Sequence, residues 1–281
     1  MKKNKWLAIS IFSPKNNWPS LLKNGISPLI DLLWNNNEII SFHLRFKDLN
    51  SEHIRLSLLV PSNLTYKVAK KTEIYFKGLF KENELSTASK NGPLKGMFVP
   101  YSEYTVHYDL YSTSMLPNGG DLLTLQEALS WSMLGAFSED VIDDDLILTF
   151  CIYILFNCYK MLPASGRLLY AKDQLTRHVV EAGYDIIENE YNDLRSSIHD
   201  IYNSVMDPLP EKTVVWLNKW ENAFKKTYTA ACHNRQESTC FDQAVNLIYQ
   251  QFKLSKFSIV LLNSFILKTL SEQISQSIHK D

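Results

Sequence analysis

Two neighbouring segments alternate between apolar and polar residues over most of their length, and this pattern limits the possible folds more than any other feature. Segments Ile39–Lys47 and His53–Val60 place an apolar residue at every second position. A period of two is typical of strands with one buried face. The turn Asp48–Glu52 is short and polar, so the two strands can pair as a hairpin with their polar faces side by side. The sequence therefore predicts a sheet with one apolar face and one polar face, the latter carrying His43, Arg45, His53 and Arg55.

The rest of the chain predicts strands first and helices later. The expected elements are a strand over Trp6–Phe12, a helix from Trp18 with Pro28 inside it, a loop over Lys81–Gly96, a strand over Glu103–Tyr111 and a turn over Leu116–Asp121. Beyond residue 122 the apolar residues recur in steps of three and four, which is typical of helices. The predicted class is α+β, with an N-terminal mixed or antiparallel sheet packed with a mostly helical C-terminal half. A single domain over residues 1–281 is expected.

Composition excludes several classes of function. The 281 residues carry a formal net charge of −1, which argues against a nucleic-acid partner held by bulk charge. The longest apolar run, Leu146–Phe156, is far shorter than the roughly 20 residues of a membrane span and is expected to be a buried helix. The N-terminus lacks a signal-peptide pattern. We therefore expect a cytoplasmic protein without a membrane partner, whose four cysteines are reduced and mostly buried.

No motif for a cofactor or a metal is found. Glycine is scarce, and neither phosphate-binding loops nor metalloprotease motifs occur. The densest acidic cluster comprises Asp140 and Asp143–Asp145, which could bind a metal or form the first turn of a helix. The helical interpretation is favoured, because negative side chains stabilise a helix N-terminus and no second acidic cluster completes a metal site. No cofactor is therefore expected.

The predicted hairpin resembles the start of a known family. Its segments read His43-Leu44-Arg45-Phe46, then Lys47-Asp48, then His53-Ile54-Arg55-Leu56-Ser57. These are similar to the Phe-Ile-Arg-Tyr strand, Asp-containing turn and His-x-Arg-x-Arg strand of the C-terminal elimination domain of class I lantibiotic dehydratases. The family also includes stand-alone thiopeptide-type bacteriocin biosynthesis proteins. The likeness is specific over about the first 60 residues.

Three departures from the elimination pattern occur together. Ser57 stands at the second arginine of His-x-Arg-x-Arg, and Tyr104–Ser114 lacks the arginine of the family's Arg-Tyr-Gly-Gly segment. Asn263 aligns with the histidine of the late His-Met-x-x-Asn-Arg helix. In glutamate-eliminating members, arginines hold the glutamyl carboxylate and a histidine serves the elimination. The resemblance therefore implies that this chemistry has been given up.

What the resemblance implies instead is the stand-alone branch of pyridine synthases, of the micrococcin or thiocillin type. Such enzymes join two dehydroalanines of a leader-bearing, azole-rich peptide by a formal aza-[4+2] cycloaddition, and then lose water and the leader. Their main task is to hold two distant segments of one peptide in reactive geometry. The expected partners are the modified precursor peptide and other tailoring enzymes.

The strand faces supply the candidate site residues. Arg55 would stabilise negative charge on oxygen, His53 would move a proton, and Ser57 would bind the substrate amide. For Arg55, a structural ion pair is the alternative role. The substrate-binding candidates are Tyr108, Tyr111, Arg45, His43 and Asn263. On a regular strand the two tyrosines face opposite sides, so that at most one lines the site.

Two other functions stay open on the sequence. The chain could be the glutamate-elimination subunit of a split class I lantibiotic dehydratase. It could also be a non-catalytic protein that binds the precursor peptide, for example by strand addition to the edge of the sheet.

Overall fold

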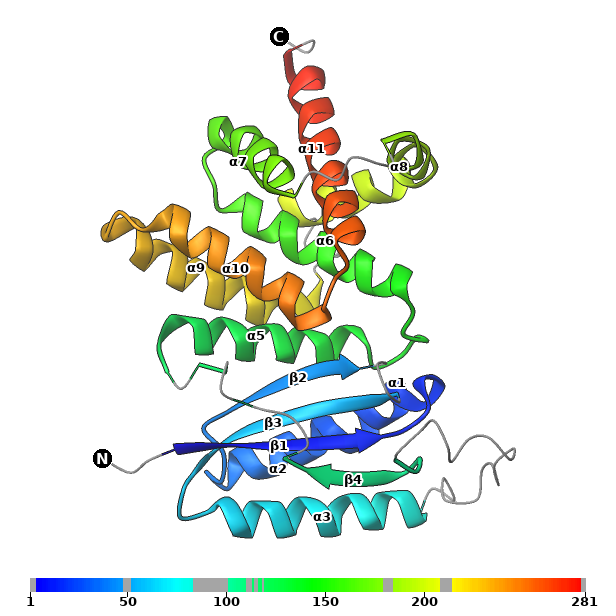
Figure 1. Cartoon of the computed structure of the whole chain (residues 1–281). Helices are drawn as coiled ribbons and strands as arrows, with labels where there is room; N and C mark the ends of the chain where they lie inside the picture. The colour runs from blue at the N-terminus through cyan, green and yellow to red at the C-terminus, as the bar shows by residue number, and fades with distance from the viewer. Residues whose placement is uncertain are drawn as a thin grey trace. The chain divides into compact units, whose positions relative to one another are not determined.

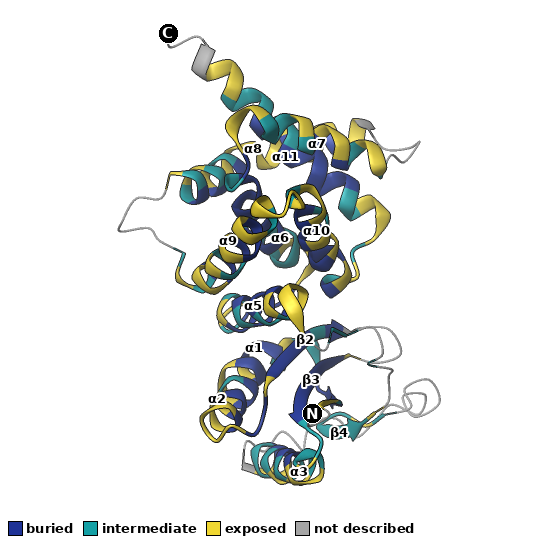
Figure 2. Ribbon diagram, turned by 90° about the vertical axis from the view of Figure 1, so that its left-hand side faces the viewer, coloured by how far each residue is buried: buried dark blue, intermediate teal, exposed yellow. Residues whose placement is uncertain are grey.

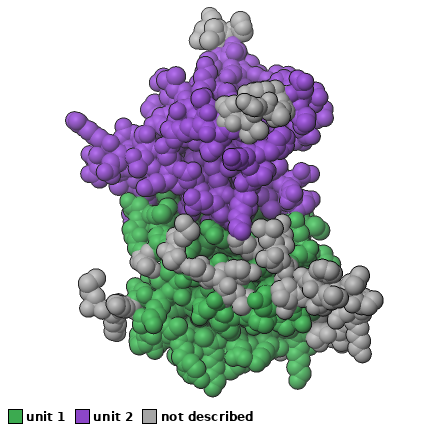
Figure 3. Space-filling model, in the orientation of Figure 1, with its two compact units in different colours: residues 1–142 green, residues 143–281 purple. Residues whose placement is uncertain are grey.

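A computed structural model describes most of the chain. The described residues are 4–47, 52–82, 101–109, 113, 116–117, 119–178, 184–207 and 214–278. The chain divides into two compact units, Met1–Ile142 and Asp143–Asp281 (Figure 3). The α+β class is confirmed, because the strands lie in the first unit and the second is helical.

The strands described in the first unit form one antiparallel sheet (Figure 1). In spatial order they are β2 (Ser41–Lys47), β3 (His53–Pro61), β1 (Asn4–Phe12) and β4 (Thr105–Tyr108). The predicted hairpin of β2 and β3 is confirmed. β4 is shorter than the predicted strand Glu103–Tyr111, because Tyr104 and Asp109 at its two ends have φ values of 59° and 54°, outside the β region.

The apolar face of the sheet packs against helices on one side (Figure 1). Trp18 stacks on Phe46 of β2, with ring centroids 5.2 Å apart. Pro28 lacks an N–H and therefore interrupts the ordinary helical hydrogen bonds, and a π-helical turn lies directly before it. The helices on this side are α1 (Trp18–Ser20), the π-helical Leu21–Ile26, α2 (Ser27–Asn35) and α3 (Thr65–Glu82).

Helix α3 approaches the π-helical turn closely at Gly25. The hydroxyl of Tyr75 donates to the Gly25 carbonyl at 3.0 Å. A Cβ added at Gly25 would lie 2.7 Å from the Cδ2 of Leu79 and 3.0 Å from the Cδ1 of Leu21, so that any larger residue would require these side chains to move. Neither the strand alternation nor the helical spacing described above predicts α3. The predicted loop Lys81–Gly96 begins inside this helix, because Lys81 and Glu82 are helical. The rest of that loop lies outside the described residues.

Helix α5 (Gly120–Ala136) lies beside the outer edge of β2. The Leu44 N–H donates to the Ser130 Oγ at 3.1 Å, and Phe42 meets Trp131 edge to face at 4.9 Å. The helix therefore covers the edge of β2 and satisfies one of its outward N–H groups.

The second unit is built around α6 (Asp144–Lys160), which includes the predicted buried helix Leu146–Phe156. This helix is apolar on nearly all sides and is surrounded by other helices (Figure 2). Asp143 accepts a hydrogen bond from the Leu146 N–H at 2.8 Å, which confirms the helical interpretation of the acidic cluster. The other helices are α7 (Ala164–Arg177), α8 (Tyr184–Met206), α9 (Asn218–His233), α10 (Glu237–Phe252) and α11 (Lys256–Ile278).

The cysteine prediction is confirmed. None of the four cysteines forms a disulfide; Cys151, Cys158 and Cys240 are buried and Cys232 is exposed. Burial raises the pKa of the Cys151 and Cys158 thiols well above the ordinary value, which makes them poor nucleophiles. Among the described helices, none combines the length and the hydropathy that a membrane span requires.

Glu38 ties the start of β2 to α3 and gives a pH-dependent prediction. This carboxylate is buried and accepts from Lys67 at 2.8 Å and Lys71 at 2.6 Å. Burial alone would raise the pKa of Glu38, but the two lysines outweigh it and hold the pKa below its ordinary value. The contribution to stability is thus present above pH 4.5 and lost as the pH falls through the lowered pKa.

Glu38→Gln is therefore expected to lower the free energy of unfolding by about 1–3 kcal/mol at pH 7 and by much less near pH 3. Urea denaturation at the two pH values measures the difference. An equal loss at both would show that the charge of Glu38 does not stabilise the fold. Glu139→Gln, whose carboxylate is exposed in its pair with Lys23, is the control and should change little at either pH.

Candidate active site

One row of polar side chains crosses all four strands on the face opposite the helices. The register places Arg55 of β3 between Ser10 of β1 and Arg45 of β2, and Ser10 is in turn opposite His107 of β4. We call His107, Ser10, Arg55 and Arg45 the arginine row. Because side chains alternate along a strand, these four residues share one face of the sheet.

The flanking rows carry the other predicted residues of the hairpin. Ser57 lies between Ala8 of β1 and His43 of β2 on one side of the arginine row. On the other side, His53 lies between Phe12 and Lys47. The structure thus brings five predicted site residues onto one face: Arg55, His53, Ser57, Arg45 and His43.

Most of this polar face is buried, with Arg45 and His107 half-buried, although a polar strand face is usually exposed to solvent. Ser57 is 0% exposed, His53 1%, His43 2% and Arg55 7%. Groups removed from water interact more strongly with a bound ligand, because the local dielectric is low. Burial of the face favours a site over an ordinary solvated sheet surface.

The electrostatics of the face favour an oxygen-rich ligand. Arg45 and Arg55 are directly opposite each other, and like charges in that position destabilise a sheet. Burial lowers the pKa of Arg45, and its Nε makes no hydrogen bond in the described part of the chain. The Oγ of Ser57 is likewise buried and without a hydrogen-bond partner there. Both atoms are donors that a substrate oxygen could satisfy.

An aromatic cluster beside the arginine row was missed by sequence reasoning. Phe12 stacks on Tyr101 at 4.6 Å and contacts His53 at 4.7 Å, and His107 lies 4.7 Å from Tyr101. Phe12 is buried, whereas Tyr101 and His107 are partly exposed and could stack against a ring of a ligand. The alternation of the β4 segment was the available signal, since it places His107 on the face opposite Tyr108.

Three candidates remain, namely Tyr108, Tyr111 and Asn263. Tyr108 is on the helix-covered face, where its hydroxyl donates to the Ala69 carbonyl at 2.9 Å and lies 2.8 Å from the Thr72 Oγ1. Tyr111 lies outside the described residues. Asn263 belongs to α11 in the second unit and is buried; its Oδ1 accepts from the Tyr249 hydroxyl at 3.0 Å.

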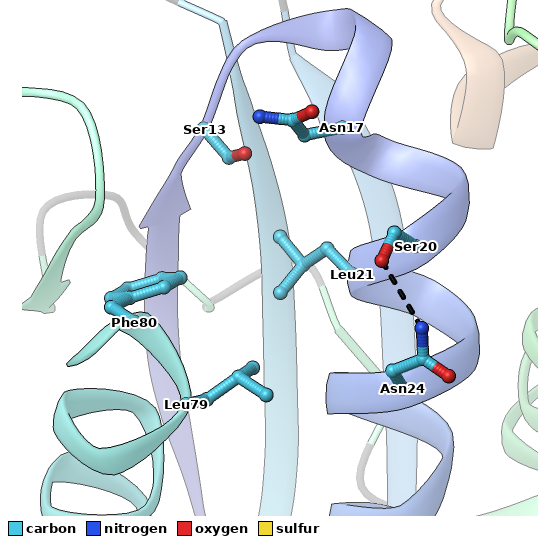
Figure 4. A pocket seen from close by; sticks show the side chains of 7 residues that line it. All are labelled: Ser13, Asn17, Ser20, Leu21, Asn24, Leu79 and Phe80. Carbon is cyan, nitrogen blue, oxygen red and sulfur yellow. Dashed lines mark hydrogen bonds between the residues drawn. The ribbon is translucent and has the colours of Figure 1, made fainter. Parts of the chain in front are cut away.

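In the described part of the first unit, two cavities border helix α3. A cavity of about 40 Å³ lies between the first helical turns and α3, and Figure 4 shows its lining. This volume fits one or two water molecules and no peptide. A groove of about 630 Å³ lies between β4 and α3, within the size range of ligand sites, and includes His107 of the arginine row.

No metal centre is found among the described residues, where no group of three or more His, Cys, Asp or Glu side chains could hold an ion. The polar face offers hydroxyl, imidazole and guanidinium groups. Such groups can donate hydrogen bonds to oxygens and transfer protons.

The model of one protein family matches most of the chain. Residues 6–265 match the model for the lantibiotic biosynthesis dehydratase C-terminal family. The chain belongs to this family. The lantibiotic dehydratase C-terminal match spans both compact units, and the resemblance predicted from the hairpin is confirmed.

Solved structures share this family fold. The thiomuracin pyridine synthase TbtD has a TM-score of 0.57 at 12% identity, over 95% of this chain and 98% of TbtD. TsrL has a TM-score of 0.60 at 10% identity, over 97% of this chain and 96% of TsrL. The tRNA-dependent lantibiotic dehydratase MibB from Microbispora sp. 107891 has a TM-score of 0.65 at 9% identity, over 97% of this chain but 28% of MibB. Comparison with curated proteins gives no match.

Proposed function

We propose that the protein is a pyridine synthase that forms the central ring of a thiopeptide macrocycle. Its substrate is a precursor peptide with a leader, azole rings and two dehydroalanines. One dehydroalanine and its neighbouring amide become a 2-azadiene, and the other is the dienophile. Loss of water and of the leader then makes the ring aromatic. The family membership and the fold shared with TbtD support this proposal.

The chemistry needs positioning more than a strong nucleophile. Holding two segments of one chain in reactive geometry can supply a large part of the barrier reduction. The guanidinium of Arg55 lies at the centre of the buried polar face and would stabilise negative charge as the amide oxygen takes up electron density. His53, one row away, would move the proton between amide nitrogen and oxygen.

The position and burial of Ser57 are the main support for the proposal. It occupies the second arginine position of the elimination motif and is fully buried beside His43, with an Oγ that makes no hydrogen bond in the described part of the chain. A neutral hydroxyl is a suitable donor for an amide oxygen. It cannot replace the bidentate contact that an arginine gives to a carboxylate.

Incubation of the purified protein with a synthetic substrate tests the proposal. The substrate is a leader-bearing peptide with thiazoles and two dehydroalanines. We expect mass spectrometry to detect the free leader and a macrocycle, and the macrocycle to show pyridine absorbance. An unchanged mass after prolonged incubation with folded protein would contradict the proposal.

Glutamate elimination is the second candidate, and the opposed Arg45 and Arg55 favour it. Two guanidinium groups on neighbouring strands could together hold a glutamyl carboxylate. A peptide with a glutamylated serine distinguishes the two functions. Its conversion to dehydroalanine, with no reaction of the bis-dehydroalanine peptide, would replace the first proposal by this one.

Replacement of Ser57 by alanine is expected to lower the activity without lowering the stability. Removal of one substrate hydrogen bond should lower the rate of pyridine formation about tenfold, corresponding to about 1.4 kcal/mol. The free energy of unfolding should stay the same or rise, because the variant removes a buried hydroxyl without a partner. Single-turnover kinetics and urea denaturation measure the two effects.

The matched control for this variant is Ser130→Ala. Its hydroxyl is also buried, but it accepts from the Leu44 N–H at the edge of the sheet. This variant should lose stability and keep the rate. Loss of stability without loss of rate in Ser57→Ala would assign Ser57 to the fold.

A further inference from the structure

The two edges of the sheet differ. The edge of β2 is covered by α5, whose Ser130 accepts from the Leu44 N–H. β4 is the last strand at the other end, and no strand pairs with its outer side in the described part of the chain. An open strand edge is a template for pairing with another chain.

The register shows which backbone groups of β4 are available. The Asp109 N–H donates to the Ala8 carbonyl at 2.9 Å, so that this pair of opposite residues is hydrogen-bonded. Hydrogen-bonded and non-hydrogen-bonded pairs alternate along antiparallel strands. The N–H and C=O groups of Val106 and Tyr108 therefore point away from β1, towards the outer edge.

The outer edge of β4 borders the groove of about 630 Å³, whose other wall is α3. Glu73, Lys77 and Phe80 line that wall, and Phe80 meets Tyr104 at 5.8 Å at the start of β4. The groove thus combines a strand edge, an apolar contact and charged side chains. This is the arrangement that binds an extended peptide by strand addition.

The charge of the helical wall indicates the kind of peptide. The charged side chains of α3 that line the groove are Glu73, Lys77 and Lys81, whereas Lys67 and Lys71 are bound to Glu38. Glu73, in the groove, is already paired with Lys77. Lys81, which also lines the groove, is exposed. An acidic segment would complement this wall.

The groove meets the candidate site at His107. His107 lines the groove and is the first member of the arginine row, which continues through Ser10 to Arg55. A chain bound along β4 would have its neighbouring residues next to the polar face. One peptide could therefore be held at the edge while its reacting part lies over the arginines.

We infer that the groove between β4 and α3 binds an acidic, extended segment of the precursor peptide as an added strand on β4. The inference rests on the proposed function and names the part of the surface that would hold the leader. Backbone hydrogen bonds to Val106 and Tyr108 supply the register, and Lys77 and Lys81 supply the preference for negative charge.

Fluorescence anisotropy with N-methylated peptides tests the strand addition on the unaltered protein. The probe is a labelled octapeptide of alternating glutamate and valine. One isomer carries N-methyl groups on all valines and the other on all glutamates. An added strand uses alternate amides only, so we expect one isomer to bind like the unmethylated probe and the other at least tenfold more weakly. Equal affinity of the two isomers, or no binding of the unmethylated probe, would overturn the inference.

A second arm tests the charge of the groove. Lys77→Ser with Lys81→Ser should weaken binding of the glutamate peptide three- to tenfold at low salt. The control is Lys225→Ser with Lys226→Ser on α9, which changes the net charge equally at two exposed positions in the other unit and should not affect binding. Equal losses in the two double variants would overturn the role of the groove.

The outcomes separate this inference from the proposed function. Pyridine formation by a protein that does not distinguish the two N-methylated isomers would overturn the docking groove and leave the enzyme activity in place. Selective binding of one isomer without pyridine formation would support the groove and contradict the activity.

Discussion

Replacement of Arg55 by alanine is expected to lower the rate of pyridine formation by a factor of about 10²–10³, the usual cost of losing one buried donor to a developing oxyanion. Arg55 is 7% exposed and lies at the centre of the arginine row, so that water cannot readily take the place of its guanidinium. Single-turnover kinetics with the bis-dehydroalanine peptide measures the effect.

Three other variants test whether the loss of rate is specific to Arg55. Arg55→Lys keeps the charge but loses the fork of donors, and its rate should be intermediate. Arg45→Ala removes the half-buried neighbour and should raise KM more than it lowers kcat. Arg195→Ala, in the helical second unit, should change neither. If the folded Arg55→Ala variant reacts at a rate within twofold of wild type, Arg55 does not contribute to pyridine formation.

Trp18→Ala is expected to produce the largest loss of stability, about 3–5 kcal/mol of unfolding free energy. Trp18 is 1% exposed, stacks on Phe46 at 5.2 Å, and donates from its indole Nε1 to the Ser13 carbonyl at 2.9 Å. Its truncation leaves a large cavity between the sheet and the helices behind it, together with a buried carbonyl that has lost its donor.

Urea denaturation followed by circular dichroism measures this loss. Trp34→Ala is the control: Trp34 is 36% exposed and contacts Trp131 at a centroid distance of 6.4 Å, so that its truncation should cost about 1 kcal/mol or less. Similar losses for the two variants would show that Trp18 does not anchor the helices to the sheet.

The sequence allowed the pairing of the hairpin to be predicted, because alternation fixes both the period and the face. It could not predict that the face with His43, His53 and Arg55 is buried. Spacing tells which side chains share a face, whereas burial depends on parts of the chain that are distant in sequence. The ambiguity between a solvated face and a site could therefore be resolved only in three dimensions.

The sequence contains a four-residue repeat that indicates helix α3, although this repeat was not recognised in the prediction. Val68, Thr72, Phe76 and Phe80 recur every four residues, and all four are buried. Lysines and a glutamate separate them, which conceals the stripe from a search for apolar runs. The placement of Tyr108 depends on this helix, because the residues that bond to its hydroxyl belong to α3.

The π-helical turn Leu21–Ile26 has a consequence for how this chain is compared with its relatives. A π-helical turn holds one residue more than an α-helical turn at the same place. A chain that lacked one residue there could form an ordinary helix and still direct Trp18 and Leu33 to the core. A one-residue gap opposite this segment in an aligned homologue would then mark an insertion that a single turn accommodates. An alignment without that gap would shift the homologue by one residue on one side of the turn, and its core residues would no longer match those of this chain.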